Sequence, residues 1–203
     1  MDLLSLPPVT TFFLILNVAV GAYTLLVDPT LIDRWAFKPF QVVREREWSR
    51  WLTAGFVHVG AMHLLFNMVT LYYFGPVIET LLGPLRFLAI YLGSELTANA
   101  LTYWRHKDNP AYSAVGASGA ISGILFSFCL FQPFAMLGVM FIIPMPAILF
   151  AVLYVVLSIY ASKREVGRIA HEAHLGGALG GLILTSILYP PVIGIFLSQL
   201  GLG

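Results

Sequence analysis

Residues 109–162 read NPAYSAVGASGAISGILFSFCLFQPFAMLGVMFIIPMPAILFAVLYVVLSIYAS, without one charged side chain. A membrane-spanning helix needs roughly 20 mostly apolar residues, so this stretch is too long for a single span. Gln132-Pro133 and Pro144-Met145-Pro146 interrupt it, and proline ends or kinks a helix. The stretch therefore predicts two spans, about residues 115–131 and 146–161, joined by an apolar connector.

Four further apolar stretches of spanning length lie on either side of this region. They cover about residues 9–27, 60–78, 85–104 and 173–189. Their apolar residues are continuous and do not alternate, which favours helices over the strands of a β-barrel. We therefore expect an all-α membrane protein, a bundle of six transmembrane helices that forms a single membrane domain over residues 1–203.

The composition agrees with a polytopic membrane protein. Of the 203 residues, 59% are hydrophobic and 10% are charged, and the mean hydropathy is +0.86. A soluble domain of this size could not bury so much apolar surface. A cytosolic globular protein, a nucleic-acid binder and a disordered chain are therefore excluded. The single cysteine, Cys129, excludes an intrachain disulfide framework. The N-terminus has no basic segment, so we interpret residues 9–27 as a retained span and not a signal peptide.

Most charged residues lie in a long first loop, residues 28–50, where aromatic residues are mixed among them. Aromatic and charged side chains together are typical of the lipid headgroup layer. We expect this first loop to lie on the membrane surface, and the tail, residues 192–203, to be interfacial as well.

Polar side chains inside the spans mark the candidate site, because they are costly at membrane depth. His63 and Asn67 lie in the second span, Ser118 in the fourth and His174 in the sixth. These three spans start on the same side of the membrane, so the four side chains are expected at one depth. Their chemistry suggests acyl transfer, with a serine nucleophile, a histidine base and additional hydrogen-bond donors.

The local sequence around Ser118 fits a nucleophile. Gly116 and Gly119 flank it and permit a tight turn and close approach of a ligand. At a helix N-terminus the Ser118 amide would supply part of an oxyanion hole. His63 and Asn67 are four residues apart and share a helix face, whereas the preceding His58 is expected in the loop or at the rim.

Small residues predict close packing between the spans that carry Ser118 and His174. Gly119 and Gly123 are four residues apart in one span, and Gly177 and Gly181 are four apart in the other. Such spacing lets two helix backbones approach closely, as a serine–histidine hydrogen bond requires.

Taken singly, these residues have simpler interpretations. Ser118 alone could be a packing residue, and His174 alone could be an interfacial histidine. His171 and His174 do not form the HExxH zinc motif, so we expect no metal and no cofactor. Glu95 and Asn99 are expected to satisfy each other, with an ion path as the alternative.

At these residues the sequence closely resembles the rhomboid intramembrane serine proteases. His58, His63 and Asn67 match the family pattern HxxxxHxxxN, and Gly116, Ser118 and Gly119 match GxSG. A third pattern, a histidine followed by two spaced glycines at the start of the last core helix, is met by His174, Gly177 and Gly181. Two departures occur. The Trp-Arg pair of the family's first loop is Trp48-Ser49-Arg50 here, and Ser122 replaces an aromatic residue that stacks on the histidine in many members.

The resemblance implies an intramembrane serine endopeptidase. Ser118 would be the nucleophile and His174 the base, while His63, Asn67 and the Ser118 amide would form the oxyanion hole, with His58 supporting it. Substrates would be single-span membrane proteins, and the fifth span with the loop after it would act as a gate. Glu79 matches a family glutamate for which a structural role is expected.

The orientation has two conflicting indications. The loops on the candidate site's side carry ten basic residues, and the other side carries only Arg86. The ten are Arg34, Lys38, Arg44, Arg46, Arg50, Arg105, Lys107, Lys163, Arg164 and Arg168. The positive-inside rule would place the site in the cytoplasm, whereas the resemblance implies an extracytoplasmic site in the cell membrane. We follow the resemblance. The alternative functions are a non-catalytic binder of transmembrane helices and a small transporter.

Overall fold

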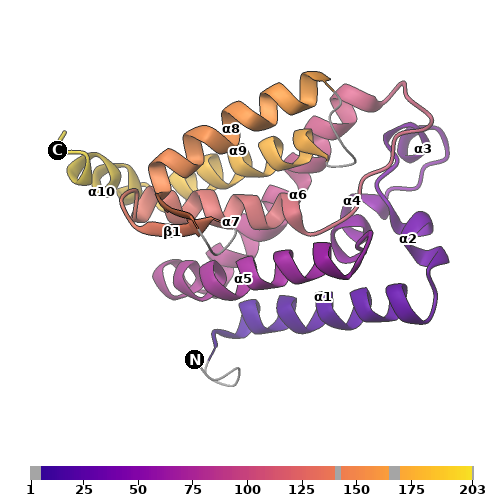
Figure 1. The fold of residues 1–203 in the computed structure, drawn as a ribbon, viewed down its shortest axis with the longest axis horizontal. Helices are drawn as coiled ribbons and strands as arrows, with labels where there is room; N and C mark the ends of the chain where they lie inside the picture. The colour runs from indigo at the N-terminus through magenta and orange to yellow at the C-terminus, as the bar shows by residue number, and fades with distance from the viewer. Residues whose placement is uncertain (1–5, 140–142, 165–169, 203) are drawn as a thin grey trace.

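A computed structural model describes residues 6–139, 143–164 and 170–202, most of which are helical. Helices occupy all six stretches for which the sequence predicts spans, with ends that differ from the expected ones by a few residues. The helices are α1 (Pro8–Leu26), α5 (Ala61–Leu82), α6 (Pro84–His106), α7 (Ser118–Phe131), α8 (Ala147–Arg164) and α9 (His171–Leu188). Figure 1 shows them running roughly side by side.

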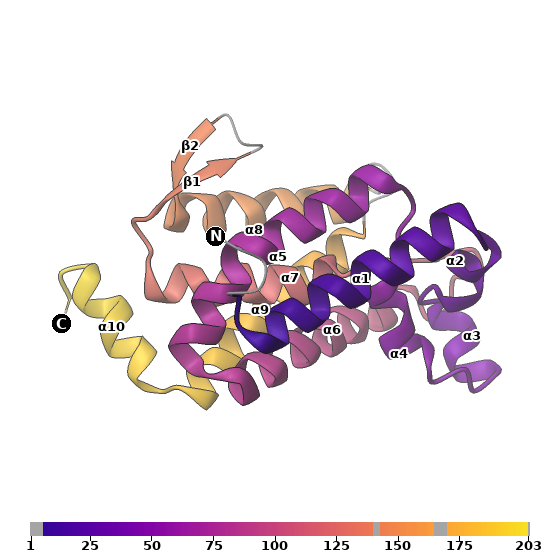
Figure 2. The same ribbon diagram turned by 90° about the horizontal axis from the view of Figure 1, so that it is seen from below.

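Helix α7 lies at the centre of the bundle, in extensive contact with α6 and α9 and also with α5. All of its residues except Ser118 and Leu130 are buried. Helix α1 covers the outer side of α5, and α8 packs beside α9 (Figures 1 and 2). A helix enclosed in this way must be apolar all round, which explains why its sequence lacks charged residues.

Length and composition identify fewer clear membrane crossings than the sequence predicts. Among the described residues, α1 and α5 are both long and apolar enough to cross a bilayer. Helix α9 and the following α10 (Pro191–Gln199) would make a third span, bent by 112°. Helix α6 is long but carries Arg86, Glu95 and Arg105, and α7 has only 14 residues.

The connector between α7 and α8 corrects the all-α prediction. It contains two short antiparallel strands, β1 (Met136–Val139) and β2 (Ile143–Pro146), with Met136 opposite Pro146. A two-stranded ribbon has free edges, which tolerate the prolines of β2 because no ladder hydrogen bond is needed there. The sequence predicts an apolar connector here, and its apolar residues show no alternation that would indicate strands.

Glu79 near the end of α5 fixes the start of α1. Its carboxylate accepts hydrogen bonds from the Val9 amide at 2.9 Å and from the Thr10 amide and hydroxyl, each at 2.7 Å. The first amides of a helix have no partner inside the helix, so a carboxylate at this end satisfies them. These contacts are those of a structural residue, and they join α1 to α5.

The first loop folds into short helical segments. These are α2 (Thr30–Trp35), α3 (Pro39–Arg44), α4 (Arg50–Thr53) and the 3₁₀ turn η2 (Ala54–Phe56). Figure 1 shows this loop at the same end of the bundle as the connection from α6 to α7. An isolated β-bridge between Phe37 and Ala114 ties the two together.

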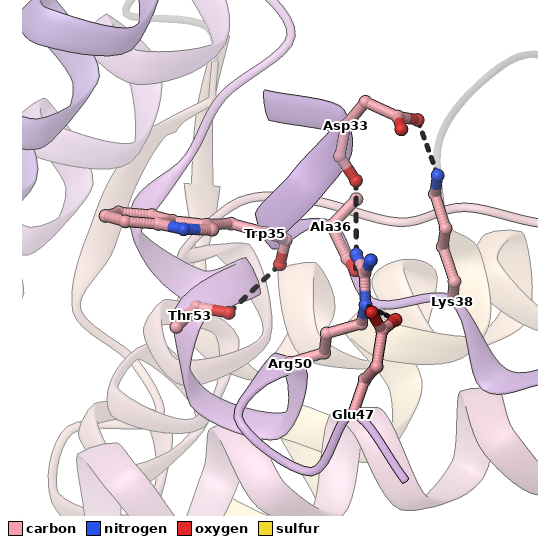
Figure 3. Close-up of polar contacts among 7 residues, drawn as sticks. All are labelled: Asp33, Trp35, Ala36, Lys38, Glu47, Arg50 and Thr53. Atoms are coloured by element: carbon pink, nitrogen blue, oxygen red, sulfur yellow. Dashed lines mark hydrogen bonds and ion pairs between the residues drawn. The ribbon is translucent and has the colours of Figure 1, made fainter. Parts of the chain in front are cut away.

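Arg50 is the main polar anchor of the first loop (Figure 3). Its buried guanidinium donates to the carbonyl oxygens of Asp33 at 3.1 Å and Ala36 at 2.7 Å, and to the Glu47 carboxylate at 2.6 Å. Thr53 donates to the Trp35 carbonyl at 3.1 Å. One arginine thus joins α2 to the start of α4.

Candidate active site

Ser118 is the first residue of α7, and the loop before it is sharply turned. Gly116 has a φ of 114°, a conformation that favours glycine. Its amide donates to the Ala54 carbonyl at 2.9 Å, and a Cβ at this position would lie 2.8 Å from His63 Nε2. Only glycine fits both the backbone angle and the nearby imidazole, and the turn explains why α7 starts at Ser118 and not at the expected residue 115.

The structure brings the hydroxyl of Ser118 next to the imidazole of His174. Ser118 Oγ lies 2.8 Å from His174 Nε2, within hydrogen-bond distance. The two residues are 56 positions apart, on α7 and α9, and both side chains are partly buried. This separation matches the geometry that a serine nucleophile and a histidine base require.

Four glycines allow this approach of α7 to α9. A Cβ at Gly177 would overlap the carbonyl oxygen of Gly119, and a Cβ at Gly181 would overlap that of Gly123. The two helices therefore touch backbone to backbone at two successive turns. The first of these contacts lies directly beside Ser118 and one turn from His174.

His63 and Asn67 lie on α5, one turn apart, and both line the same cavity as Ser118 and His174. Asn67 is buried, and its Nδ2 has no hydrogen-bond partner among the described residues. A buried amide nitrogen without a partner is costly. An unused donor that lines the same cavity as a serine hydroxyl therefore indicates a binding position for the acceptor oxygen of a ligand.

His58 precedes α5, in the loop where the sequence places it, but it is fully buried and not at the rim. Its ring packs edge-on against His63, with ring centroids 5.1 Å apart. Burial and the neighbouring His63 lower the pKa of His58 to about 4. His58 therefore stays neutral at physiological pH and packs against the His63 ring.

A cavity of about 1220 Å³ runs past these side chains. Ser118, His174, His63 and Asn67 are among its lining residues, and its walls extend from α2 to strand β1. The lining is mostly apolar, with this polar group as its chief interruption. Apolar cavities with a few convergent polar groups are typical binding sites.

Two acidic residues near the site have their own partners. Glu172, two residues before His174, accepts from Arg105 at 2.9 Å and from Ser162 at 2.7 Å. Its carboxylate is thus held by α6 and α8, which agrees with the expectation that it points away from His174.

The described residues contain no cluster of three or more His, Cys, Asp and Glu side chains suited to a metal ion.

Glu95 has a contact that sequence reasoning missed. Asn99 donates to it at 3.2 Å, as expected for this i, i+4 pair, and the Ala120 amide donates to its other oxygen at 3.2 Å. The carboxylate therefore caps the start of α7, two residues after Ser118. Nothing in the sequence indicates this contact, because it depends on how α6 is rotated against α7.

Tyr154 on α8 is a second residue near the site that the sequence does not indicate. Its ring stacks near that of His174, with centroids 6.0 Å apart and an interplanar angle of 29°. Its hydroxyl lies 2.6 Å from Ser122 Oγ. The sequence leaves open what orients His174 once Ser122 replaces the expected aromatic residue, and no motif singles out Tyr154 among the aromatic residues of its span.

Comparison with known proteins identifies related chains. The model of the Rhomboid domain family matches residues 45–191. YdcA, a rhomboid protein of Bacillus subtilis, is 37% identical over 131 residues, covering 64% of each chain. The rhomboid protease GluP of the same bacterium is 30% identical, over 80% of this chain and 30% of its own. The mitochondrial RHOMBOID-like protein 12 of Arabidopsis thaliana is also 30% identical, over 63% of this chain and 42% of its own.

The chain thus spans less than two thirds of the length of each of these relatives. The matched region nevertheless includes the candidate site and the whole α7–α9 contact. The site residues within it are Arg50, His58, His63, Asn67, Ser118 and His174. Because the family model matches well over half of its residues, this chain belongs to the rhomboid family of integral membrane proteins.

Proposed function

We propose that this protein is an intramembrane serine endopeptidase that cleaves single-span membrane proteins with Ser118 and His174. The observation that carries the proposal is the 2.8 Å separation of Ser118 Oγ and His174 Nε2 beside a large, mostly apolar cavity. Relatives named as rhomboid proteases support the same reaction class. No cofactor or metal is needed for this chemistry.

In the proposed reaction, Ser118 Oγ attacks the scissile carbonyl carbon while its proton passes to His174 Nε2. His174 then donates this proton to the leaving amine, and water hydrolyses the acyl-enzyme by the same route in reverse. Nε2 must be unprotonated at the start, because it accepts the hydroxyl proton.

The oxyanion would be stabilised by the Ser118 amide and by the side chains of His63 and Asn67. The Asn67 Nδ2 supports this role, because this donor is already desolvated and has no acceptor among the described residues. His58 would hold the His63 ring, and Gly116 would leave it room. Each of these groups comes from an element other than α9, so the base and the oxyanion donors lie on separate helices.

The shape of the cavity supports a transmembrane segment as the substrate. The cavity lies between α5 and α8 and continues past Phe128 to β1, which gives an apolar path below Ser118. Helix α8, together with the loop after it, would be the gate. Residues 165–169 of that loop lie outside the described residues.

We also infer six crossings, formed by one membrane domain in the cell membrane with the candidate site on the extracytoplasmic side. Helix α7 would be about 21 Å long, shorter than the roughly 30 Å hydrocarbon core. Its enclosure by α5, α6 and α9 supports a span that needs no lipid contact along its length. Labelling of a cysteine introduced at the exposed Trp48, in intact cells, tests the orientation.

The rival function is a non-catalytic binder of transmembrane helices. Such a protein has no need for a serine and a histidine in hydrogen-bond contact. Reaction with a fluorophosphonate probe separates the two functions, because only an activated serine is labelled. A transporter is disfavoured by the lack of a repeat in the sequence.

The deciding experiment uses purified protein in proteoliposomes with a single-span model substrate. Ser118→Ala and His174→Ala are expected to abolish both cleavage and fluorophosphonate labelling while the protein still inserts. Ser198→Ala is the matched control, because Ser198 is on α10 and its hydroxyl donates only locally to Ile195. Cleavage by purified Ser118→Ala would overturn the proposal.

A further inference from the structure

Tyr154 connects helix α8 to both halves of the proposed catalytic pair. Its ring faces the ring of His174 on α9, at a centroid distance of 6.0 Å. Its hydroxyl lies 2.6 Å from Ser122 Oγ on α7, and Ser122 Oγ in turn lies 2.7 Å from the Ser118 carbonyl oxygen. Since Ser122 donates its single proton to Ser118, the Tyr154 hydroxyl must be the donor to Ser122.

This link differs from the rest of the contact between α8 and the bundle. Most apolar side chains of α8 point outward, among them Val152, Val156 and Leu157, each more than half exposed. The contact of α8 with α7 is slight compared with that of α9. The Tyr154 hydroxyl is thus a specific polar attachment on a helix that is otherwise loosely held.

A histidine base on a single helix needs a neighbour that limits the rotation of its ring. The Glu172 carboxylate forms an ion pair with Arg105 and accepts a hydrogen bond from Ser162, so it does not orient His174. The ring of Tyr154 lies beside the imidazole at a centroid distance of 6.0 Å, and the Ser122 hydrogen bond fixes where that ring lies. A misplacement of about 1 Å between reacting groups can cost about 100-fold in rate.

We propose that Tyr154 is a positioning residue for His174, and that its place on α8 makes the Ser118–His174 pair depend on α8 being seated against α7. Movement of α8 away from the bundle removes the stacked ring and releases His174. This inference rests on the proposed function, because it assigns a role within the same reaction.

The first test compares Tyr154→Ala, Tyr154→Phe and the control Tyr160→Ala, a tyrosine on the same helix that is 53% exposed. Tyr154→Ala is expected to lower kcat and the fluorophosphonate labelling rate about 100-fold with little change in KM. Tyr154→Phe keeps the ring and loses one hydrogen bond, so a decrease of about fivefold is expected. Tyr160→Ala should change neither quantity more than twofold.

A relocation variant distinguishes positioning from packing. Tyr154 also contacts Phe126 and Phe150, with ring centroids 5.4 and 5.6 Å away, so its loss could simply loosen the fold. In Tyr154→Ala the space beside Ser122 is vacated, and an added Ser122→Tyr places an aromatic ring there from α7. This double variant is expected to recover at least tenfold of the lost labelling rate.

The dependence on α8 has its own measurement. Phe150→Ala weakens the seating of α8 without touching His174, and it is expected to lower the labelling rate about tenfold in the wild-type background. In the Ser122→Tyr/Tyr154→Ala background the ring no longer comes from α8, so the same change should cost less than twofold. Equal effects in both backgrounds would overturn the coupling.

The two proposals fail in different ways. If wild-type protein shows no labelling that depends on Ser118, the proposed function is wrong and this inference is wrong with it. If wild-type labelling depends on Ser118 but folded Tyr154→Ala keeps its rate within twofold, or changes KM alone, only the role of Tyr154 is overturned. Should Tyr154→Ala fail to fold, Tyr154→Phe and the relocation variant decide by the same criteria.

Discussion

The α7–α9 contact and helix α8 are packed in opposite ways. Helix α7 is buried on nearly every side, and its glycines touch the backbone of α9. Helix α8 presents an apolar face outward and borders the cavity on its inner side. Ser118 and His174 belong to the tightly packed part, and Tyr154 belongs to the loosely packed one. In the proposed reaction, the tight contact would hold the reacting atoms, and access to them would pass beside the loosely packed helix α8.

The largest expected effect comes from disturbing the tight contact. A Cβ in Gly177→Ala would collide with the Gly119 backbone, which cannot rotate away, so we expect a loss of about 3 kcal/mol of stability. The collision also pushes His174 away from Ser118, which should reduce activity further. Unfolding in detergent, followed by helical circular dichroism, measures the first effect.

Gly194→Ala on α10 is the matched control for this change. No atom lies within 4 Å of a Cβ at Gly194, so the methyl group meets no obstacle there. Alanine in an exposed helix position should stabilise by up to about 1 kcal/mol relative to glycine. Equal effects of the two substitutions would show that the α7–α9 contact is not especially tight.

An effect of similar size, on the reaction and not on the fold, is expected from Asn67→Ala. If Asn67 donates to the oxyanion, its loss should lower kcat/KM by about 100- to 1000-fold, equivalent to about 3–4 kcal/mol in the barrier. Stability should change little or rise, because an unpaired buried amide is removed. Ser186→Ala is the control, because Ser186 lies outside the cavity lining and its hydroxyl donates to the Leu182 carbonyl of its own helix, α9. A parallel loss of stability and activity would contradict an oxyanion role.

The tight part of the fold was largely predictable from the sequence. Each long helix is a mostly apolar stretch, and lipid leaves the backbone little choice other than a helix. The polar residues His63, Ser118 and His174 could be assigned to one depth because their spans alternate in direction. The paired glycines of two spans then predicted which helices approach closely.

The loose part was not predictable in the same way. The β1–β2 hairpin has no alternating pattern, and its prolines predicted only a break between two spans with an apolar connector. The contacts of Tyr154 with Ser122 and of Glu95 with Ala120 depend on the rotation of neighbouring helices, which hydropathy does not determine. A single tyrosine among many aromatic residues of a span carries no signal of its own.

Acid should destabilise the site through His58, which lies in the loop just before α5. Its pKa is about 4 in the folded protein and about 6.5 when exposed, so the unfolded state binds more protons between these values. Stability is therefore expected to fall as the pH decreases from about 6.5 to 4, by up to about 3 kcal/mol in total. Unfolding midpoints measured across this range should depend on pH less steeply in His58→Gln. Identical slopes for both proteins would contradict the assignment.

The smallest effect is expected furthest from the reacting atoms, at the Glu79 cap of α1. Glu79→Gln keeps the size of the side chain but removes the charge that accepts the Val9 and Thr10 hydrogen bonds, which should cost about 2 kcal/mol. Glu45→Gln is the control, since Glu45 is exposed in the first loop and should change stability by less than about 0.5 kcal/mol.

The activity of Glu79→Gln tests whether the start of α1 is independent of the candidate site. Helix α1 packs mainly on α5 and lies away from the α7–α9 contact, so folded Glu79→Gln should label with fluorophosphonate at the wild-type rate. Stability and activity would then be lost independently, one at α1 and the other at Tyr154 or Asn67. A labelling rate that falls with the stability of Glu79→Gln would mean that the bundle acts as one mechanical unit, and the contrast between its tight and loose parts would not hold.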